Sequence, residues 1–200
     1  MRRFCTWVFI LAVALIPAPA TSASPPVVVI DALHAQLLDT MKRARELGFQ
    51  GRYDSLRPIL ERSFDFERMI AVAAGSYWTQ ASESERQRLL EAFTKLSIST
   101  YAARFNAFGG ESFETLGERA GLRDSVFVDT RLNRTSEPAV AITYVMTQRE
   151  GTWRIVDVLL DRSISELAVR RSEYNQVLRD GGPEKLAQTL DQKAAQLREP

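Results

Sequence analysis

The chain has 200 residues, with 26 Lys and Arg against 25 Asp and Glu, one His and one Cys. This balance of charge argues against binding to nucleic acid and against a strongly basic membrane-surface patch, both of which need an excess of basic residues. A single cysteine excludes an internal disulfide and a thiolate metal site.

The N-terminal segment has the order of a secretory signal peptide. A basic pair at residues 2–3 precedes an uncharged apolar run over residues 4–16, and prolines and small residues follow. The run is too short to span a bilayer comfortably as a permanent anchor. An uncleaved anchor is the alternative, but the small residues are those that a signal peptidase needs.

We expect cleavage after Ala20 or Ala23, so that residues 1–23 are removed and residues 24–200 form a single domain. The only cysteine, Cys5, precedes the apolar run and is not placed as a lipoprotein acceptor. Of the 26 basic residues, loss of the two arginines leaves 24, against 25 acidic residues. Without disulfides, such a domain must be stabilised by its core, and its length is sufficient for one.

The first half of this domain predicts helices. Apolar residues recur at helical spacing over residues 27–47, where Gly48 ends the pattern. A shorter helix is expected over residues 52–64. Asp65 is a favourable N-cap for a third helix, which stops at Gly75.

The longest helix begins with a capping box formed by Ser82 and Glu85. It is expected to run to about Phe108, because one apolar stripe continues to that residue. The stripe comprises Leu89, Phe93, Leu96, Thr100, Tyr101, Phe105 and Phe108.

The period changes to strand-like alternation after the long helix. Four strands are expected, over residues 111–120, 126–132, 140–146 and 152–160. Short turns join them, which predicts an antiparallel meander. Helical spacing then returns, broken at Gly181 and Gly182, and Pro183 opens a last helix. The pattern predicts an α+β fold with helices packed on one face of a curved antiparallel sheet.

Residues that could carry out chemistry are few. The only histidine, His34, has no cysteine or serine motif near it, and we interpret it as a surface or half-buried structural residue. No cluster has metal-ligand spacing and the glycines form no phosphate-binding loop, so no metal and no cofactor are expected.

Asp157 is the one candidate for acid–base chemistry. Strand alternation places it on the same face as Trp153 and Ile155, where it could act as a base with Tyr144 as a donor. The favoured interpretation is a buried structural acid bonded to the backbone or to an arginine.

Aromatic and methionine side chains recur on the long helix and the strands. Such stripes form a core more often than a pocket, but they can also line a cavity. Arg104, beside the stripe, either lies at a pocket mouth or pairs with an acid on the surface. The candidate cavity residues are Phe93, Tyr101, Phe105, Val128, Ile142, Tyr144, Met146 and Trp153.

Three segments resemble the toluene-tolerance, MlaC-like family, the periplasmic substrate-binding component of Mla-type phospholipid transport. Residues 64–105 read FDFERMIAVAAGSYWTQASESERQRLLEAFTKLSISTYAARF, with an aromatic-Asp-aromatic start, a Trp before a capping box and a Tyr-x-x-Arg-Phe end. Residues 140–165 match the family's strand, turn, "Trp, Asp-Val" and Ser pattern, and residues 170–193 match its tail. The resemblance covers nearly the whole exported domain.

One position departs from this pattern. Many members have a glycine before the serine that follows the last long strand, whereas this chain has Asp161, Arg162 and Ser163. The departure points toward the related branch found with hopanoid biosynthesis.

The resemblance implies a cone-like fold, similar to the nuclear-transport-factor-like cone, with an apolar cavity that holds a phospholipid or a hopanoid-type lipid. It implies a periplasmic carrier without enzyme activity, with an outer-membrane lipoprotein complex and an inner-membrane ABC transporter as partners. Two rivals stay open: an isomerase or lyase of this cone type with Asp157 as general base, and a periplasmic adaptor with a filled core.

Overall fold

The computed structural model describes residues 25–161 and 163–198, so the predicted signal peptide lies outside the described residues. The helices are α1 (Pro26–Lys42), α2 (Ala44–Ser63), α3 (Phe66–Ala74), α4 (Ser76–Gln80), α5 (Glu83–Arg104) and α6 (Glu166–Gln196). The strands are β1 (Ser112–Ala120), β2 (Val126–Asn133), β3 (Val140–Arg149), β4 (Thr152–Leu160) and β5 (Ile164–Ser165). This order confirms the predicted α+β class.

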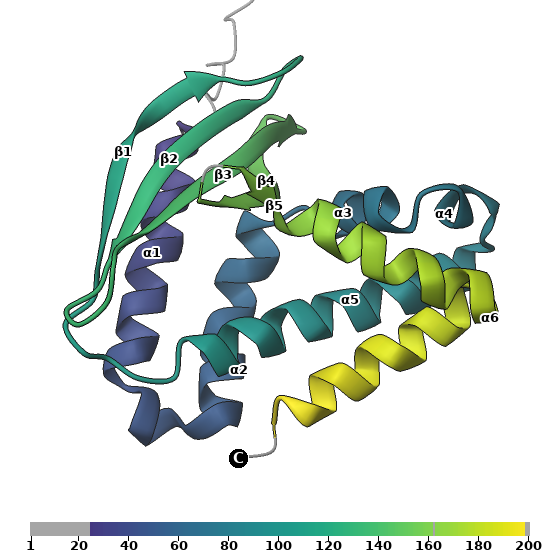
Figure 1. Ribbon diagram of the computed structural model, residues 1–200, viewed down its shortest axis with the longest axis horizontal. Coiled ribbons are helices and arrows are strands. Elements are labelled where there is room, and N and C mark those ends of the chain that lie inside the picture. Colours follow the sequence, from purple (N-terminus) through teal and green to yellow (C-terminus); the bar gives the residue numbers. More distant parts are fainter. Residues whose placement is uncertain (1–24, 162, 199–200) are drawn as a thin grey trace, which may run out of the picture.

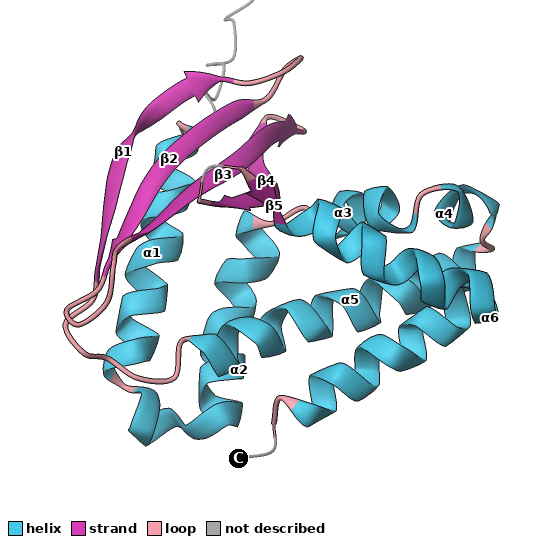
Figure 2. Cartoon of the chain, viewed as in Figure 1, coloured by secondary structure: helices cyan, strands magenta, loops and turns pink. Residues whose placement is uncertain are grey.

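The strands form one antiparallel sheet in the order β1-β2-β3-β4-β5, which confirms the meander. Figure 1 shows the sheet lying across α1, with α5 and α6 extending away from it. The strands gather at one end of the molecule, where α1 packs against them, and α3 to α6 extend away from that end (Figure 2). The short β5, which the sequence pattern did not predict, pairs with the end of β4 and leads directly into α6.

Glycines break the helical pattern where predicted, at Gly48 and Gly182, but the first helix ends earlier than expected, because α1 stops at Lys42 and not at residue 47. Gly48 interrupts α2 with φ 59° and ψ −174°, a left-handed conformation that costs glycine little. Gly182 has φ 67° and divides α6. The chain of α6 therefore bends sharply at this glycine, its two segments diverge from the bend, and α6 packs against α5 (Figure 1).

The capping box of α5 is present as predicted. The Ser82 side chain accepts a hydrogen bond from the Glu85 amide, and the Glu85 carboxylate accepts one from the Ser82 amide at 2.8 Å. The other end of α5 differs from the expectation, because the helix ends at Arg104 and not near Phe108. Phe105 leaves the helix with φ −96° and ψ 58°, and its ring stacks on that of Tyr101 at 5.7 Å.

The core joins the inner face of the sheet to the helices. Its most deeply buried side chains come from both layers and are fully shielded from solvent. They include Leu33 and Leu37 of α1, Leu60 of α2, Phe93 of α5 and Ile155 of β4. Among the described residues, no helix is long and apolar enough to cross a membrane.

Candidate functional site

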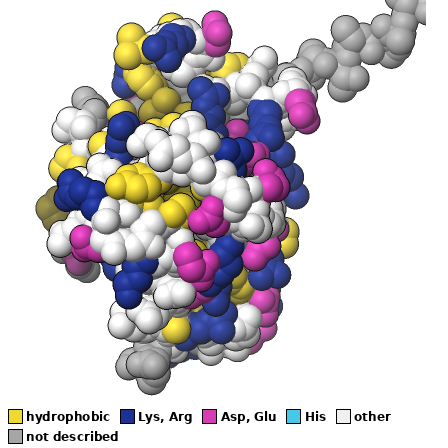
Figure 3. Space-filling view, turned by 90° about the vertical axis from the view of Figure 1, so that its right-hand side faces the viewer, with side chains coloured by type: hydrophobic (Ala, Val, Ile, Leu, Met, Phe, Trp, Pro, Cys, Tyr) yellow, Lys and Arg dark blue, Asp and Glu magenta, His cyan; other side chains and the backbone are white. Residues whose placement is uncertain are grey.

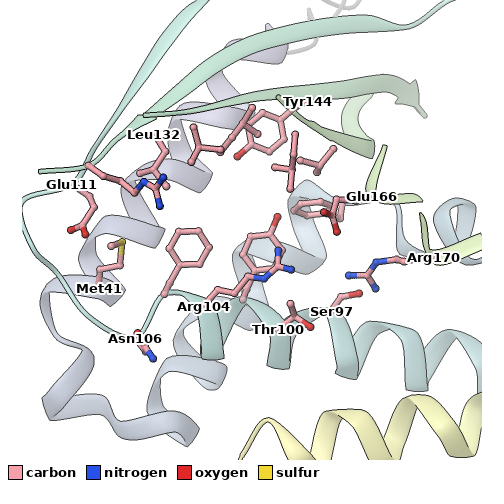
Figure 4. Close-up of a pocket in the computed structure, with 18 of the residues that line it drawn as sticks. Met41, Ser97, Thr100, Arg104, Asn106, Glu111, Leu132, Tyr144, Glu166 and Arg170 are labelled. Carbon is pink, nitrogen blue, oxygen red and sulfur yellow. The ribbon is translucent and has the colours of Figure 1, made fainter. Parts of the chain in front are cut away.

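A cavity of about 450 Å³ lies between the inner face of the sheet and the C-terminal half of α5 (Figure 4). Its sheet wall is apolar apart from one tyrosine hydroxyl. The lining residues of this wall are Leu132, Val140, Ile142, Tyr144, Val158 and Leu160. Side chains from three strands thus enclose one face of the hollow.

The opposite wall comes from the helices. α5 contributes Ser97, Thr100 and Tyr101, and Phe105 follows at its end. Four buried apolar side chains from other helices and the α2–α3 junction close the hollow, namely Met41, Phe64, Phe66 and Met69. The lining is therefore mostly apolar, as in sites for hydrophobic ligands.

Aromatic rings hold the shape of this wall. The Tyr101 ring meets Phe64 edge-on at 5.7 Å and stacks on Phe105 at 5.7 Å. Phe105 in turn lies 6.4 Å from Phe113 of β1. These contacts tie the α2–α3 junction, α5 and the sheet together around the hollow, with centroid distances typical of favourable ring pairs.

His34 of α1 packs against the cavity residue Tyr144 without itself lining the cavity. Its Nε2 atom lies 3.0 Å from the Tyr144 hydroxyl, and its ring stacks on Phe113 at 4.0 Å. His34 is only 4% exposed, so the expectation of a surface or half-buried histidine was wrong; the aromatic neighbours cover it. Burial lowers the pKa of His34 from 6.5 to about 4, although the Asp31 carboxylate opposes the shift, so the ring is neutral at pH 7.

The two tyrosines of the cavity are also neutral. Burial raises the pKa of Tyr101 to about 12, against the opposing effect of Arg170 and Arg104. Burial raises the pKa of Tyr144 well above its usual value. The interior of the hollow therefore contains hydroxyl groups but no ionised tyrosine.

The eight predicted cavity residues divide into two groups. Tyr101, Phe105, Ile142 and Tyr144 line the hollow. The others pack in or against the core beside it: Phe93, Val128, Met146 and Trp153. Phe93, for example, lies between the rings of Phe66 and Tyr174 at 6.1 Å and 6.5 Å. Lipid contact stays a prediction for all eight.

Sequence reasoning missed several residues of the lining. Leu132 and Val140 continue the inward alternation of β2 and β3, so that signal was present in the sequence. A β-bulge in β4 shifts the inward alternation of that strand, so simple alternation did not place Val158 and Leu160 in the lining. Met41 comes from α1, and no local pattern marks it as part of a cavity.

The bulge also corrects the placement of Asp157. Met146 pairs with Ile155 but Val145 pairs with Asp157, so Val156 is an extra residue in β4. Asp157 therefore points away from the face that carries Ile155 and Tyr144, and the predicted shared face was wrong.

Asp157 serves the start of α6. Its carboxylate accepts hydrogen bonds from the Ser165 hydroxyl at 2.6 Å, the Leu167 amide at 3.1 Å and the Val158 amide at 2.8 Å. This agrees with the favoured interpretation of a structural acid bonded to the backbone. The isomerase or lyase hypothesis loses its base, because Asp157 does not line the cavity.

Charged side chains lie at the edge of the cavity. Arg104, Glu166 and Arg170 lie where α5 faces the start of α6 (Figure 4). Glu111 lies in the loop between α5 and β1, and Arg134 directly follows β2. Arg104 thus lies at the cavity, and in the described part of the chain it has no ion pair with an acid. Of the two alternatives predicted for Arg104, a pocket mouth or a surface ion pair, the structure therefore supports the pocket mouth.

Two further observations limit the chemistry of the surface. In residues 25–161 and 163–198, no three His, Cys, Asp or Glu side chains gather so that they could hold a metal ion. On the face shown in Figure 3, basic and acidic side chains alternate and do not form one continuous basic patch.

Comparisons with known proteins agree with this fold. The solved structure of the phospholipid-binding protein from Ralstonia solanacearum, in complex with a phospholipid, is similar with a TM-score of 0.77. The two sequences are 23% identical, and the match covers 88% of this chain and 100% of that chain. A search of curated proteins finds no match.

A family model described as MlaC protein matches residues 31–192. The match confirms the family resemblance inferred from the ordered motifs of the sequence, whereas the hopanoid-associated branch stays a prediction. Because it covers most of the chain, this protein belongs to the MlaC protein family.

Proposed function

We propose that this protein binds the hydrocarbon part of a phospholipid in the cavity between the sheet and α5. The observation that carries the proposal is a hollow of about 450 Å³ with apolar walls. Ligand sites of proteins occupy roughly 300–1,000 Å³ and have mostly apolar walls. An adaptor with a filled core would have no such hollow.

The energetics favour a hydrocarbon occupant. Burying one methylene contributes about 0.8 kcal/mol, so a sixteen-carbon chain is worth on the order of 12 kcal/mol. A carrier that takes such a chain out of a bilayer must offer a comparably apolar interior. Val140, Ile142, Leu160 and the ring of Phe105 supply this interior.

The relative from Ralstonia solanacearum supports phospholipid as the cargo, because that protein was solved with a phospholipid bound. The family supports a role in lipid transport. We propose that the chain acts in the periplasm, after export by the predicted signal peptide. There it would exchange lipid with an outer-membrane lipoprotein complex and an inner-membrane ABC transporter.

We also propose that the protein is a binder and not an enzyme. Tyr101 and Tyr144 are neutral hydroxyls, and His34 lies outside the lining, next to Tyr144, with its pKa lowered to about 4 by burial. Such groups can donate or accept hydrogen bonds to a ligand, but none is poised as a base at pH 7.

The experiment is mass spectrometry of an organic extract of the protein, purified without detergent from the periplasmic fraction. We expect phospholipid in a stoichiometric amount, and none in a cavity-free periplasmic protein purified in parallel. An extract without stoichiometric lipid would contradict the proposal, and a hopanoid in place of phospholipid would replace the proposed cargo.

A further inference from the structure

Two arginines at the cavity edge are not neutralised by carboxylates. Arg104 ends α5, and among the described residues no acid forms an ion pair with it. The Arg170 guanidinium lies 5.3 Å from the centre of the Phe93 ring and interacts with Tyr174, but it too has no carboxylate partner in the described chain. In Figure 4 both side chains extend toward the space between α5 and α6.

The other charged residues of the lining have different surroundings. Arg134 forms an ion pair with Glu137 and donates to the Pro138 carbonyl. Glu111 accepts a hydrogen bond from the Gly109 amide at 2.6 Å. These two groups have partners within their own loops.

Among the described lining residues, Glu166 is the carboxylate that shares this part of the cavity edge with Arg104 and Arg170. It lies in the first turn of α6, where the helix dipole favours a negative charge. Its charge is therefore partly balanced by the helix itself. Two arginines facing one such glutamate leave this edge of the cavity positive.

We propose that Arg104 and Arg170 form the subsite for the phosphate of the lipid head group. The inference rests on the proposed function, because it needs the lipid tails to occupy the hollow. Guanidinium groups bind phosphate through paired N–H donors. With the tails against Ile142 and Leu160, a phosphate at the edge would lie between α5 and α6, within reach of both guanidinium groups.

The Tyr101 hydroxyl adds to this subsite. It belongs to the same cavity lining as the two arginines, and both guanidinium charges act on it. It is neutral at pH 7, so it can donate a hydrogen bond to a phosphate or ester oxygen. The subsite thus joins a polar edge to an apolar interior, as an amphiphilic lipid requires.

The test measures a preference between two lipids that differ only in the phosphate. Delipidated protein is incubated with phosphatidylcholine vesicles that contain equal amounts of dioleoyl phosphatidic acid and dioleoylglycerol, and the lipid bound to the protein is quantified by mass spectrometry. We expect the wild type to favour phosphatidic acid, and the Arg104→Gln, Arg170→Gln double variant to lose about three- to tenfold of that preference.

Arg179→Gln is the matched control, because Arg179 is an exposed arginine of α6 outside the cavity lining. It should keep the wild-type ratio. Arg104→Gln alone should show part of the loss without a change in folding, since Arg104 has no structural partner among the described residues. The ratio of the two bound lipids also does not depend on the fraction of protein that is folded.

Three results would overturn the subsite. They are equal loading of both lipids by the wild type, an unchanged ratio in the double variant, and saturable binding of inorganic phosphate alone that the double variant abolishes. The last would indicate a site for free phosphate. Wild-type protein that takes up neither lipid would contradict the proposed function as well, which distinguishes the two failures.

Discussion

The Nε2 atom of His34 lies 3.0 Å from the hydroxyl oxygen of Tyr144, which connects α1 to the wall of the cavity. The only histidine of the chain thus has a neutral hydrogen-bond partner and an aromatic neighbour, Phe113. A protonated ring would be desolvated there, with only the opposing effect of Asp31 to stabilise it. This burial makes the stability of the fold depend on pH.

We predict that the free energy of unfolding decreases as the pH falls from about 6.5 toward 4. The pKa of His34 is 6.5 when exposed and about 4 in the fold, so in this window the unfolded chain binds a proton that the folded chain does not. The full effect is about 3 kcal/mol, of which about 1 kcal/mol is lost by about pH 5.5. Urea denaturation at a series of pH values measures it.

His34→Gln keeps a hydrogen-bonding group near Tyr144 but does not titrate. The variant should be less stable at pH 7, and its unfolding free energy should change less between about pH 7 and about pH 5.5, where the carboxylates stay mostly ionised. If the variant and the wild type show the same slope in this range, His34 does not cause the pH dependence.

The elements of the fold could be predicted because their signals are local. Ser82 and Glu85 stand three residues apart at the start of α5, and Gly48 and Gly182 lie where the helical pattern stops. Alternation along β2 and β3 continues through the ladder without an extra residue. Each of these features depends on a few neighbouring residues.

The hollow could be predicted only in part, because it depends on distant contacts. Phe93 and Tyr101 belong to one helical stripe, yet only Tyr101 borders the cavity. Phe93 is covered by the rings of Phe66 and Tyr174, which come from distant segments. The bulge at Val156 reverses the alternation of β4, which a period of two cannot reveal. The apolar spacing likewise continues past the end of α5.

Asp157→Asn should destabilise the fold without changing the cargo. The substitution weakens the hydrogen bonds from the Ser165 hydroxyl and the Leu167 amide, which hold the start of α6 against β4. We expect a loss of about 1–2 kcal/mol in the free energy of unfolding. Lipid extracted per folded molecule should stay the same, because Asp157 lies outside the cavity lining. A lipid-free but fully stable variant would contradict this role.

Asp191→Asn should loosen the contact between α5 and the second segment of α6. Asp191 forms ion pairs with Arg88 and, at 2.8 Å, with Lys95. Because one carboxylate joins two partly buried cations, we expect a loss of about 1 kcal/mol. Glu173→Gln is the control, since its 3.7 Å pair with Lys193 is exposed on both sides and should contribute little. Equal effects of the two substitutions in thermal denaturation would exclude a special role for Asp191.

Filling the hollow should remove the lipid. Ile142 and Leu160 are cross-strand partners that both line the cavity, so Ile142→Trp with Leu160→Trp places two indoles in its space. We expect bound lipid to fall several-fold, with a stability change of about 1–3 kcal/mol from overpacking. Ile142→Asp should also give a lipid-free protein or an unstable one.

Leu122→Trp is the control for the double tryptophan variant, because Leu122 is 84% exposed and lies away from the lining. It should keep the wild-type lipid load. Circular dichroism and the thermal transition identify the variants that are folded, and mass spectrometry then gives lipid per folded protein. A folded double variant that carries as much lipid as the wild type would mean that the tails bind elsewhere, because two indoles and an acyl chain cannot occupy the same hollow of about 450 Å³.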